Sequence, residues 1–565
     1  VEPLRMANEL MLAARKAMSA AGKTAADLKN FTASLGDMTA KGSVAAKMGE
    51  TTTVDANLAM GRLDLDKLMP VKAAESGDAA PAASGEPAPA GTFSLPAGVN
   101  ANANVTVDQV VYQGNSIDQV KLVAGLADSK LNLTELSAQL PGATKVKLGG
   151  TLQAQNGQPA FAGGLDLNAG NLRALIDAFA KGAVDSVPGD RLRSFALNSR
   201  VTFTPAQVAL SDLAAKLDAT KIAGGVTVAL PDGQKRQRMA FGVGLSIDQM
   251  NLDGYMPVKK AEAAPAATTN KPADMGGNPL KALAPLGDLD ANIELRAGAL
   301  TMNDQQVKKL HALIGLAGGV LTIEDLSVGD LMGGKGAIKG QIVELKGNPR
   351  FDLDFDVTAK DANKLAQMAG AAPAGKLGAL TLKGKASGGG DEVSYDVAMA
   401  MSGIGLDGTA KGGAAGLLAG GIPRVNSTFD IKIDKLAPLV ALGGSGGDNA
   451  TQLKAADNLG SVAFKGTAQS GTDDLAYDVD LSLAGIGGAG KLSGKITGIS
   501  GTPSVDTTLD LRADRPAPLL QLAGLAGPKA QQMGTLAAKG SLKGSADDLN
   551  LDLGLQAAEI GRAHV

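Results

Sequence analysis

Metal binding and nucleophilic catalysis depend most often on histidine and cysteine, and this sequence is poor in both. Its 565 residues include no cysteine and two histidines, His311 and His564. His311 stands alone in Val307-Lys-Lys-Leu-His-Ala-Leu313, at a position that we expect to correspond to an apolar one in an earlier repeat copy. No H-E-x-x-H motif, cysteine cluster or G-x-x-x-x-G-K-S/T loop occurs. Zinc hydrolysis and P-loop chemistry therefore have no support.

Carboxylates are the remaining residues whose spacing could do chemistry. They occur as pairs or rows, namely Asp473-Asp474, Asp547-Asp548 and the series Asp352, Asp354, Asp356. Such groups serve in glycosidases and in calcium sites. Here they fall in turns or at every second residue of a strand, where water solvates them. We predict no catalytic residue, no metal site, no cofactor and no enzyme activity.

Charge and hydropathy exclude two further classes of protein. The chain has 54 basic and 57 acidic residues and a net charge of -3, whereas a nucleic-acid binder normally carries a basic face. The absence of cysteine rules out a disulfide scaffold. No run of 18 or more apolar residues appears, so the sequence contains no membrane-spanning helix.

The elements that would position these residues are strands with strict alternation. Apolar residues from Phe351 to Val357 are separated by the aspartates just named, and Leu475 to Leu483 alternate with small and acidic residues. A period of two places apolar side chains on one face and polar ones on the other, as in antiparallel sheets solvated on one side. We predict a mainly β fold, a long curved antiparallel β-groove of repeated units with short helices at unit ends and an N-terminal helix.

Two repeats of different length organise the chain. In the longer one, the segment Arg62-Leu-Asp-Leu-Asp-Lys-Leu-Met-Pro-Val-Lys72 recurs as Gln249-Met-Asn-Leu-Asp-Gly-Tyr-Met-Pro-Val-Lys259, so that Lys72 corresponds to Lys259. A shorter repeat marks the C-terminal part, where a Lys-Gly pair at Lys383 returns at Lys465 and again at Lys539. The linkers that follow the two copies of the longer segment are rich in Ala and Pro and lack apolar periodicity.

Several strands lead into short pieces with helical spacing, at Asn171 to Phe179, Lys435 to Val440 and Pro516 to Leu520, which we expect to cap the sheet.

The repeats and linkers divide the chain into seven segments. The segments are 1–50, an N-terminal helical segment with a helix from Met6 to Leu35; 51–71, a strand and turn; 72–91, a linker; 92–258, a first β-repeat region; 259–279, a linker; 280–558, a second β-repeat region with units of 75–80 residues; and 559–565, a tail.

We expect both ends to be cut. The chain starts at Val1 rather than Met and opens inside the predicted helix. The third Lys-Gly unit stops where Glu559-Ile-Gly-Arg-Ala-His-Val565 begins, and this tail back-translates to the start of a common sequencing adapter. We interpret the tail, with His564, as not biological.

The repeated units resemble the AsmA family of bacterial envelope proteins. The likeness rests on a strand followed by N/D-L-x-x-(L/Y), as in Asn171-Leu-Arg-Ala-Leu175 and Met250-Asn-Leu-Asp-Gly-Tyr-Met-Pro257, and on the Gly-flanked Lys-Gly strands. It covers about Thr51 to Gln556. The resemblance implies an inner-membrane anchor at a missing N-terminal helix, a periplasmic body built as a β-groove, and a role in outer-membrane assembly or phospholipid transport between membranes.

Under this resemblance, the apolar strand faces contact lipid. The partners are a phospholipid or another envelope lipid and the inner membrane, without nucleic acid. The alternative is a purely structural or adhesive β-repeat protein whose faces are packed internally. The candidate residues facing lipid in the groove are Phe351, Leu353, Phe355, Val393, Tyr395, Val397, Leu475, Tyr477, Val479, Leu481 and Leu483.

Overall fold

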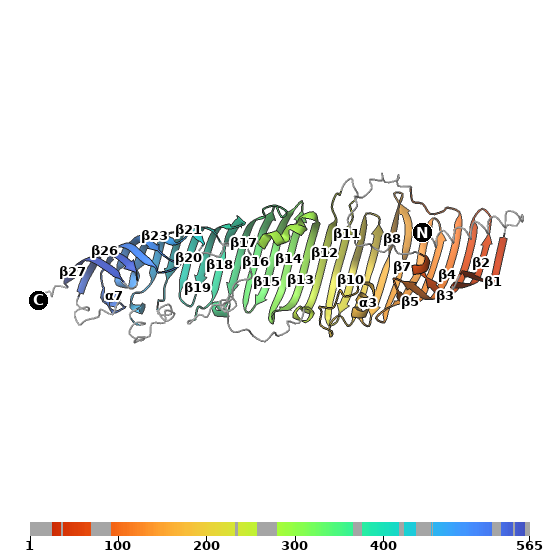
Figure 1. Cartoon of the computed structure of the whole chain (residues 1–565), viewed down its shortest axis with the longest axis horizontal. Coiled ribbons are helices and arrows are strands. Elements are labelled where there is room, and N and C mark those ends of the chain that lie inside the picture. Colours follow the sequence, from red (N-terminus) through yellow and green to blue (C-terminus); the bar gives the residue numbers. More distant parts are fainter. Residues whose placement is uncertain are drawn as a thin grey trace. The chain divides into compact units, whose positions relative to one another are not determined.

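The fold is mainly β, as the alternation predicts. A computed structural model describes residues 25–35, 38–68, 92–231, 236–256, 279–364, 376–416, 423–436, 454, 456–522, 533–545 and 548–559, and these contain 27 strands. The chain divides into two compact units, Val1–Ala264 with Ile293–Asp304 and Pro265–Asn292 with Gln305–Val565. Within each unit the strands lie side by side in chain order as an open sheet (Figure 1).

In unit 1 each strand from β1 to β12 pairs with the next one. All of these pairs are antiparallel except β3 with β4, which is parallel and joined by a crossover connection. The strands are β1 (Ala25–Leu35), β2 (Met38–Lys47), β3 (Thr52–Asp64), β4 (Val99–Tyr112), β5 (Asn115–Ala127), β6 (Lys130–Leu140), β7 (Thr144–Gln155), β8 (Gln158–Ala169), β9 (Phe195–Thr204), β10 (Gln207–Leu217), β11 (Thr220–Ala229), β12 (Ala240–Asn251) and most of β13 (Asp290–Met302).

In unit 2 every pair from β14 to β27 is antiparallel. The strands are β14 (Gln305–Ala317), β15 (Val320–Leu331), β16 (Gly334–Val343), β17 (Arg350–Ala359), β18 (Leu380–Gly389), β19 (Glu392–Met401), β20 (Leu406–Ala415), β21 (Arg424–Ile433), β22 (Val462–Ser470), β23 (Asp474–Leu483), β24 (Gly488–Thr497), β25 (Ser504–Ala513), β26 (Met533–Ser545) and β27 (Leu549–Glu559).

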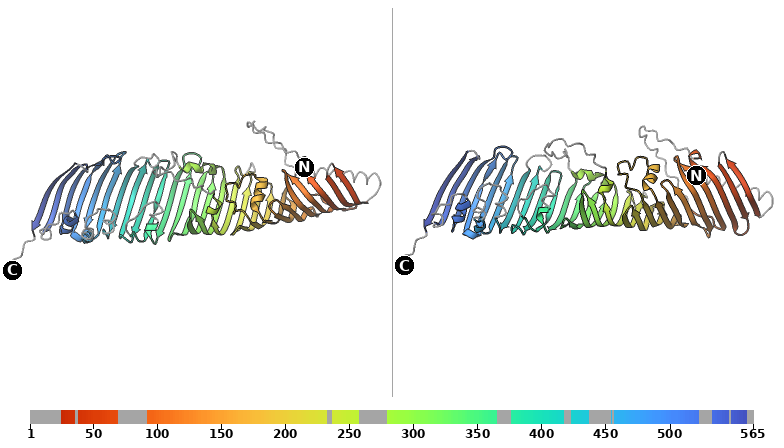
Figure 2. Two further views of the ribbon diagram at one scale, coloured as in Figure 1. Left: turned by 60° about the horizontal axis from the view of Figure 1, so that its bottom comes forward. Right: turned by 90° about the horizontal axis from the view of Figure 1, so that it is seen from below.

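Short helical pieces lie at the ends of strands, as Figure 2 shows for α7 at one rim of unit 2. They are α2 (Leu65–Leu68), α3 (Leu172–Phe179), η1 (Asp253–Tyr255), η2 (Pro279–Asp288), η3 (Ala484–Ile486) and α7 (Ala517–Leu522). Two predicted turns, α3 and α7, are confirmed, while most of the third, from 437 to 440, lies outside the described residues. Within the described ranges, no helix combines the length and hydrophobicity that crossing a membrane requires.

The predicted helix from Met6 to Leu35 is wrong over its last third. Residues 25–35 form strand β1, and residues 6–24 lie outside the described part of the chain. A β-bulge between Leu28 and Phe31 adds one residue to β1 relative to β2, so apolar residues three apart point to the same face. That spacing mimics a helix. The predicted helical segment 1–50 therefore contains two strands, and the tail beyond Glu559 and nearly all of both linkers lie outside the described residues.

The Lys-Gly pairs of unit 2 have a packing role. A Cβ atom built on Gly384, Gly412 or Gly466 would overlap a backbone carbonyl of the next strand, those of Asp396, Asn426 and Asp478 respectively. Glycine is thus needed on one face for the strands to approach each other. The preceding lysine lies on the opposite face and forms an ion pair with aspartate, as described below.

One rim of unit 2 holds a packed core. Leu459, Val462, Leu483, Ile486 and Ala513 form a buried cluster, and the partly buried Leu436, Phe464, Leu481 and Leu519 pack against it. Leu519 comes from α7 and Ile486 from η3. These helical pieces therefore close the ends of β22, β23 and β25, as predicted for caps.

Candidate functional site

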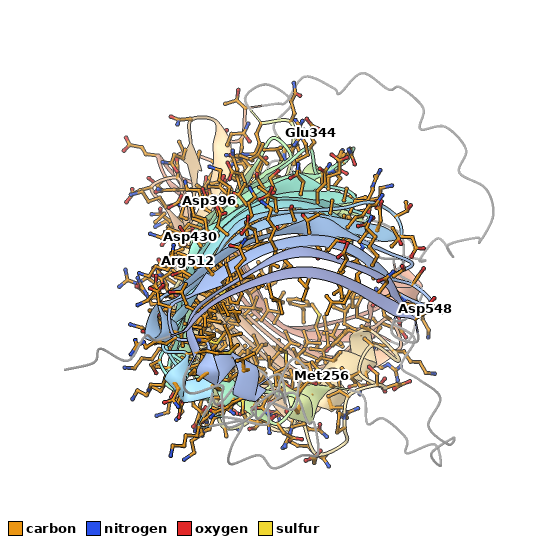
Figure 3. All side chains as sticks on the ribbon, turned by 90° about the vertical axis from the view of Figure 1, so that its left-hand side faces the viewer. Met256, Glu344, Asp396, Asp430, Arg512 and Asp548 are labelled. Atoms are coloured by element: carbon orange, nitrogen blue, oxygen red, sulfur yellow. The ribbon has the colours of Figure 1, made fainter. Side chains whose placement is uncertain are left out.

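The candidate site is one face of the sheet formed by β17 to β25 in unit 2. We call it the apolar face and define it by the positions on the same side as Phe351, Val393 and Leu475 in the strand register. None of these positions in β17 to β25 carries Asp, Glu, Lys or Arg. Every charged residue of these nine strands lies on the other side, the charged face. In Figure 3, Asp396, Asp430 and Arg512 point outward from the convex side of the curved strands of unit 2.

Along one cross-strand row of the apolar face, from Phe355 in β17 to Val479 in β23, large and small side chains alternate from strand to strand. Phe355 lies opposite Gly384, which in turn lies opposite Val397 on the next strand. Phe429 and Val479 flank Gly466 in the same way. The large side chains of alternate strands are therefore separated by low backbone surface.

The sequence-predicted groove residues all lie on this face. Ten of the eleven are neither buried nor fully exposed, and Leu483 is the exception at 9% exposed. Leu483 belongs to the packed cluster at the rim, and Leu481 packs against it. These two residues are therefore core at the closed end of the face, while the other nine are half-buried.

On the charged face, lysines and aspartates of neighbouring strands form a ladder. Each pair joins directly opposite residues, as in Lys383–Asp356 at 2.9 Å, Lys411–Asp396 at 3.2 Å, Lys465–Asp430 at 3.2 Å and Lys539–Asp510 at 3.1 Å. All of these side chains are more than 45% exposed, so each pair adds little stability. The ladder keeps this face exposed to solvent.

The carboxylates that could suggest chemistry serve as structural acceptors or ion-pair partners. Asp473 accepts hydrogen bonds from the backbone N–H and the hydroxyl of Ser500, and these bonds lower its pKa. Asp474 pairs with Lys495, which lowers its pKa. Asp354 pairs with Lys385 at 3.3 Å. Among the described residues, no group of three or more His, Asp or Glu could hold a metal ion. Asp547 lies outside the described residues.

His311 does not occupy the position that the sequence suggested. Its Nδ1 lies 2.8 Å from Oδ2 of Asp325, and it faces Ser327 across β14 and β15. In β5 and β6 the same register places Lys121 opposite Ser137, with Lys121 Nζ 2.8 Å from Glu135. The counterpart of His311 is therefore a lysine, and the expectation of an apolar counterpart is wrong.

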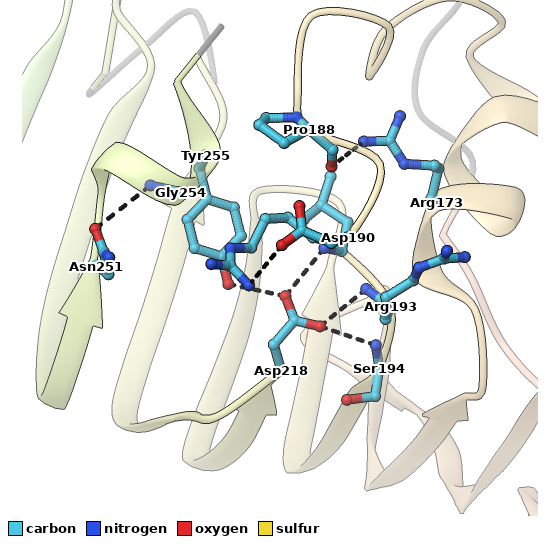
Figure 4. Close-up of polar contacts among 11 residues, drawn as sticks. Arg173, Pro188, Asp190, Arg193, Ser194, Asp218, Asn251, Gly254 and Tyr255 are labelled. Carbon is cyan, nitrogen blue, oxygen red and sulfur yellow. Dashed lines mark hydrogen bonds and ion pairs between the residues drawn. The ribbon is translucent and has the colours of Figure 1, made fainter. Parts of the chain in front are cut away.

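Asp218, in unit 1, accepts four hydrogen bonds (Figure 4). It accepts backbone N–H bonds from Leu192, Arg193 and Ser194 at 2.8–3.0 Å and a 2.9 Å bond from the hydroxyl of Tyr255. Burial opposes ionisation, but these bonds outweigh it and hold the pKa of Asp218 below its usual range. Burial and the bond to Asp218 raise the pKa of Tyr255 to about 12. With its acceptors engaged, Asp218 is a structural tie rather than a base.

The longer repeat places an aspartate under a hairpin turn in both copies. Asp66 accepts from the backbone N–H groups of Gln113 and Gly114 at 2.7 and 2.8 Å. Asp253 accepts in the same way from Asn303 and Asp304 at 2.6 and 2.9 Å. These turn residues have φ between 51° and 74°, as two-residue hairpin turns require. The repeated motif thus fixes a hairpin turn in each copy.

Three shallow cavities are lined by a mixture of polar and apolar strand residues. In unit 2, one of about 490 Å³ is bordered by Gln341, Asp352 and Ser387, and one of about 690 Å³ by Lys495, Asp506 and Lys543. A third, of about 570 Å³ in unit 1, is bordered by Asp166, Lys216 and Lys221. The two in unit 2 are on the charged face.

Sequence reasoning missed the polar groups of the apolar face. Ser427 and Thr507 are 8% and 7% exposed and share one cross-strand row with Tyr395 and Tyr477. The tyrosines were predicted on this face, but the row becomes visible only when the register of seven strands is known. A comparison with protein-family models finds no match, and neither does a search of curated proteins.

Proposed function

We propose that the apolar face of unit 2 shelters the acyl chains of an envelope phospholipid. In this proposal the protein is an AsmA-like periplasmic component with the inner membrane as partner, acting in lipid transport between membranes or in outer-membrane assembly. It needs no enzyme activity, because an acyl chain can slide along an apolar surface without bond chemistry.

The observation that supports it is the complete separation of charge across β17 to β25. A face without charge, lined by half-buried residues such as Leu353 and Val397, could gain about 0.8 kcal/mol for each CH₂ group of a ligand that it removes from water. The charged face, with pairs such as Lys411–Asp396, stays solvated. The alternative, a structural or adhesive repeat, requires these side chains to be packed. Among the described residues, packing of this kind is found at the rim around Ile486.

Because the chain has no cysteine, single cysteines can report on each face. Val397→Cys places a fluorescent label on the apolar face, and the matched control Asp396→Cys places it on the charged face of the same strand. Phospholipids with brominated acyl chains are expected to quench the label at position 397 and not at position 396. Equal quenching at both positions, or at neither, contradicts the proposal.

A second experiment tests capture directly. Val479→Asp introduces a charge into the apolar face, and Ala476→Asp introduces the same charge on the exposed side of the same strand. A photo-crosslinkable phospholipid should label the wild type and Ala476→Asp alike and Val479→Asp several-fold less. Circular dichroism checks that both variants fold. Loss of structure in Val479→Asp alone would show that position 479 is core and favour the structural alternative.

A further inference from the structure

The geometry points to a ligand of narrower class: an ester-linked acyl lipid whose ester group lies against the hydroxyls of Tyr395 and Tyr477. This inference rests on the proposed function and adds to it the chemistry of the bound molecule. A free fatty acid and an ether-linked lipid are the molecules that it excludes as preferred ligands.

The hydroxyls of the apolar face gather in one row across the sheet. From β19 to β25 the directly opposite residues are Tyr395, Gly412, Ser427, Ala468, Tyr477, Gly494 and Thr507. The apolar-face positions of β17 to β25 contain one further hydroxyl, Ser470 at the end of β22, which is engaged with the loop at Pro423 and Val425. The hydroxyls of this row therefore lie at the same height along the strands on an otherwise apolar face.

Tyr477 is the accessible member of a hydroxyl pair. It reaches across Gly494 to the buried Thr507, and the two hydroxyl oxygens are hydrogen-bonded. Within such a pair one O–H is donated to the partner, which leaves the second O–H free to donate elsewhere. Tyr395 faces the buried Ser427 across Gly412 in the same arrangement of strands. Thr507 is therefore a positioning residue beneath the half-buried phenol of Tyr477, whereas the hydroxyl of Ser427 donates to the backbone carbonyls of Lys411 and Thr428.

The row divides the face into a longer and a shorter part. Tyr477 is the fourth residue of β23, and Leu481, which packs against the rim cluster, is the eighth. Four residues of strand span about 13 Å, slightly less than the roughly 15 Å depth of one lipid leaflet. An acyl chain laid along the strand from the row would therefore cover this stretch and end against the cluster around Leu459 and Ile486.

The chemistry of the row selects the ligand. An ester carbonyl on an apolar surface needs a hydrogen-bond donor, which a phenol supplies, whereas an ether oxygen is a weaker acceptor. An ionised carboxylate would need a cation, and no apolar-face position of β17 to β25 carries one. An ester therefore suits the row better than a free fatty acid or an ether.

Matched lipids test this assignment. Quenching of a label at Val397→Cys is titrated with a brominated diester phospholipid, its diether analogue with the same head group, and a brominated fatty acid. We expect the diester to bind about threefold to tenfold more tightly than the diether, the effect of one neutral hydrogen bond. In Tyr395→Phe with Tyr477→Phe this preference should disappear, while Tyr112→Phe, an exposed tyrosine of unit 1, should keep it.

The outcomes separate the two proposals. Equal quenching by diester and diether in the wild type, or tighter binding of the fatty acid, overturns the inference and leaves the proposed function intact. Absence of quenching by every lipid rejects the proposed function itself. A preference for diester over diether that survives the double Tyr→Phe change also overturns the assignment to these hydroxyls. Because Tyr→Phe preserves the aromatic ring, the variant retains the apolar packing.

Discussion

Nδ1 of His311 lies 2.8 Å from Oδ2 of Asp325, at the two positions where Lys121 and Glu135 form a 2.8 Å ion pair in the earlier repeat copy. A serine accompanies each carboxylate, Ser327 in one case and Ser137 in the other. The repeated feature is therefore a side-chain nitrogen held against a carboxylate next to a β-bulge, and not a particular side chain.

This equivalence predicts how His311 responds to substitution. His311→Lys should leave the denaturant midpoint nearly unchanged, because lysine fulfils this role in β5. His311→Leu should destabilise the protein by about 1 kcal/mol, since it removes a partly buried hydrogen bond. Urea titrations at neutral pH measure both. Equal losses in the two variants would show that the imidazole itself matters.

Two adjacent glycines of β20 should differ sharply in their tolerance of a methyl group. Gly412→Ala drives a Cβ into the carbonyl of Asn426, whereas in Gly413→Ala the nearest atom is an ordinary contact at 3.5 Å. We expect Gly412→Ala to cost more than about 2 kcal/mol, because backbone must move, and Gly413→Ala to stay within about 0.5 kcal/mol. Thermal unfolding followed by circular dichroism compares them. Similar melting temperatures would contradict the close approach of β20 and β21.

The Asp218 tie predicts a dependence of stability on pH. Its pKa is lowered in the fold, so its stabilising effect is present above the unfolded value near 3.9 and is lost as pH falls through the lower folded value. Asp218→Asn should therefore cost about 1–3 kcal/mol at pH 7 and progressively less below about pH 4. Chemical denaturation from pH 3 to pH 7 tests this. If the difference in unfolding free energy between the wild type and Asp218→Asn did not change with pH, the ionisation of Asp218 would not be its cause.

Leucines at the closed rim and on the open face should respond differently to truncation. Leu459 is 5% exposed within the packed cluster, so Leu459→Ala should cost about 2–5 kcal/mol. Leu353 is only half-buried, and Leu353→Ala should cost under about 1.5 kcal/mol in the absence of lipid. Denaturant midpoints compare the two. A larger loss at Leu353 would place a covering layer over the face.

The alternation of apolar and charged residues was sufficient to predict the strands and the candidate face. Phe351 and Asp352 alternate without interruption, so each side chain of β17 is assigned to its face from the sequence. The same logic failed at Leu28 and Phe31, where a bulge reproduces helical spacing. Alternation is a local property of one segment, whereas a bulge depends on how that segment pairs with the strand opposite. A single segment therefore does not reveal it.

The features that required the structure depend on register. Asp66 precedes its turn residue Gln113 by 47 positions, whereas Asp253 precedes Asn303 by 50, so the second copy contains a longer connection. The offset that relates Lys72 to Lys259 therefore does not hold beyond that connection, and it predicts the wrong counterpart for His311. The row that joins Tyr395 to Thr507 likewise combines seven strands, and no single segment of sequence contains it.

One row of the apolar face of unit 2 repeats along the sheet. From Phe355 to Val479, glycine or alanine separates large side chains at every second strand, a step of about 10 Å, and Tyr395 and Tyr477 are four strands apart, a step of about 19 Å. If this face carries lipid as proposed, a molecule moving across the strands would meet no charged side chain from β17 to β25. Such a surface favours neither direction, so the direction of net movement would be set by where the molecule is loaded and unloaded.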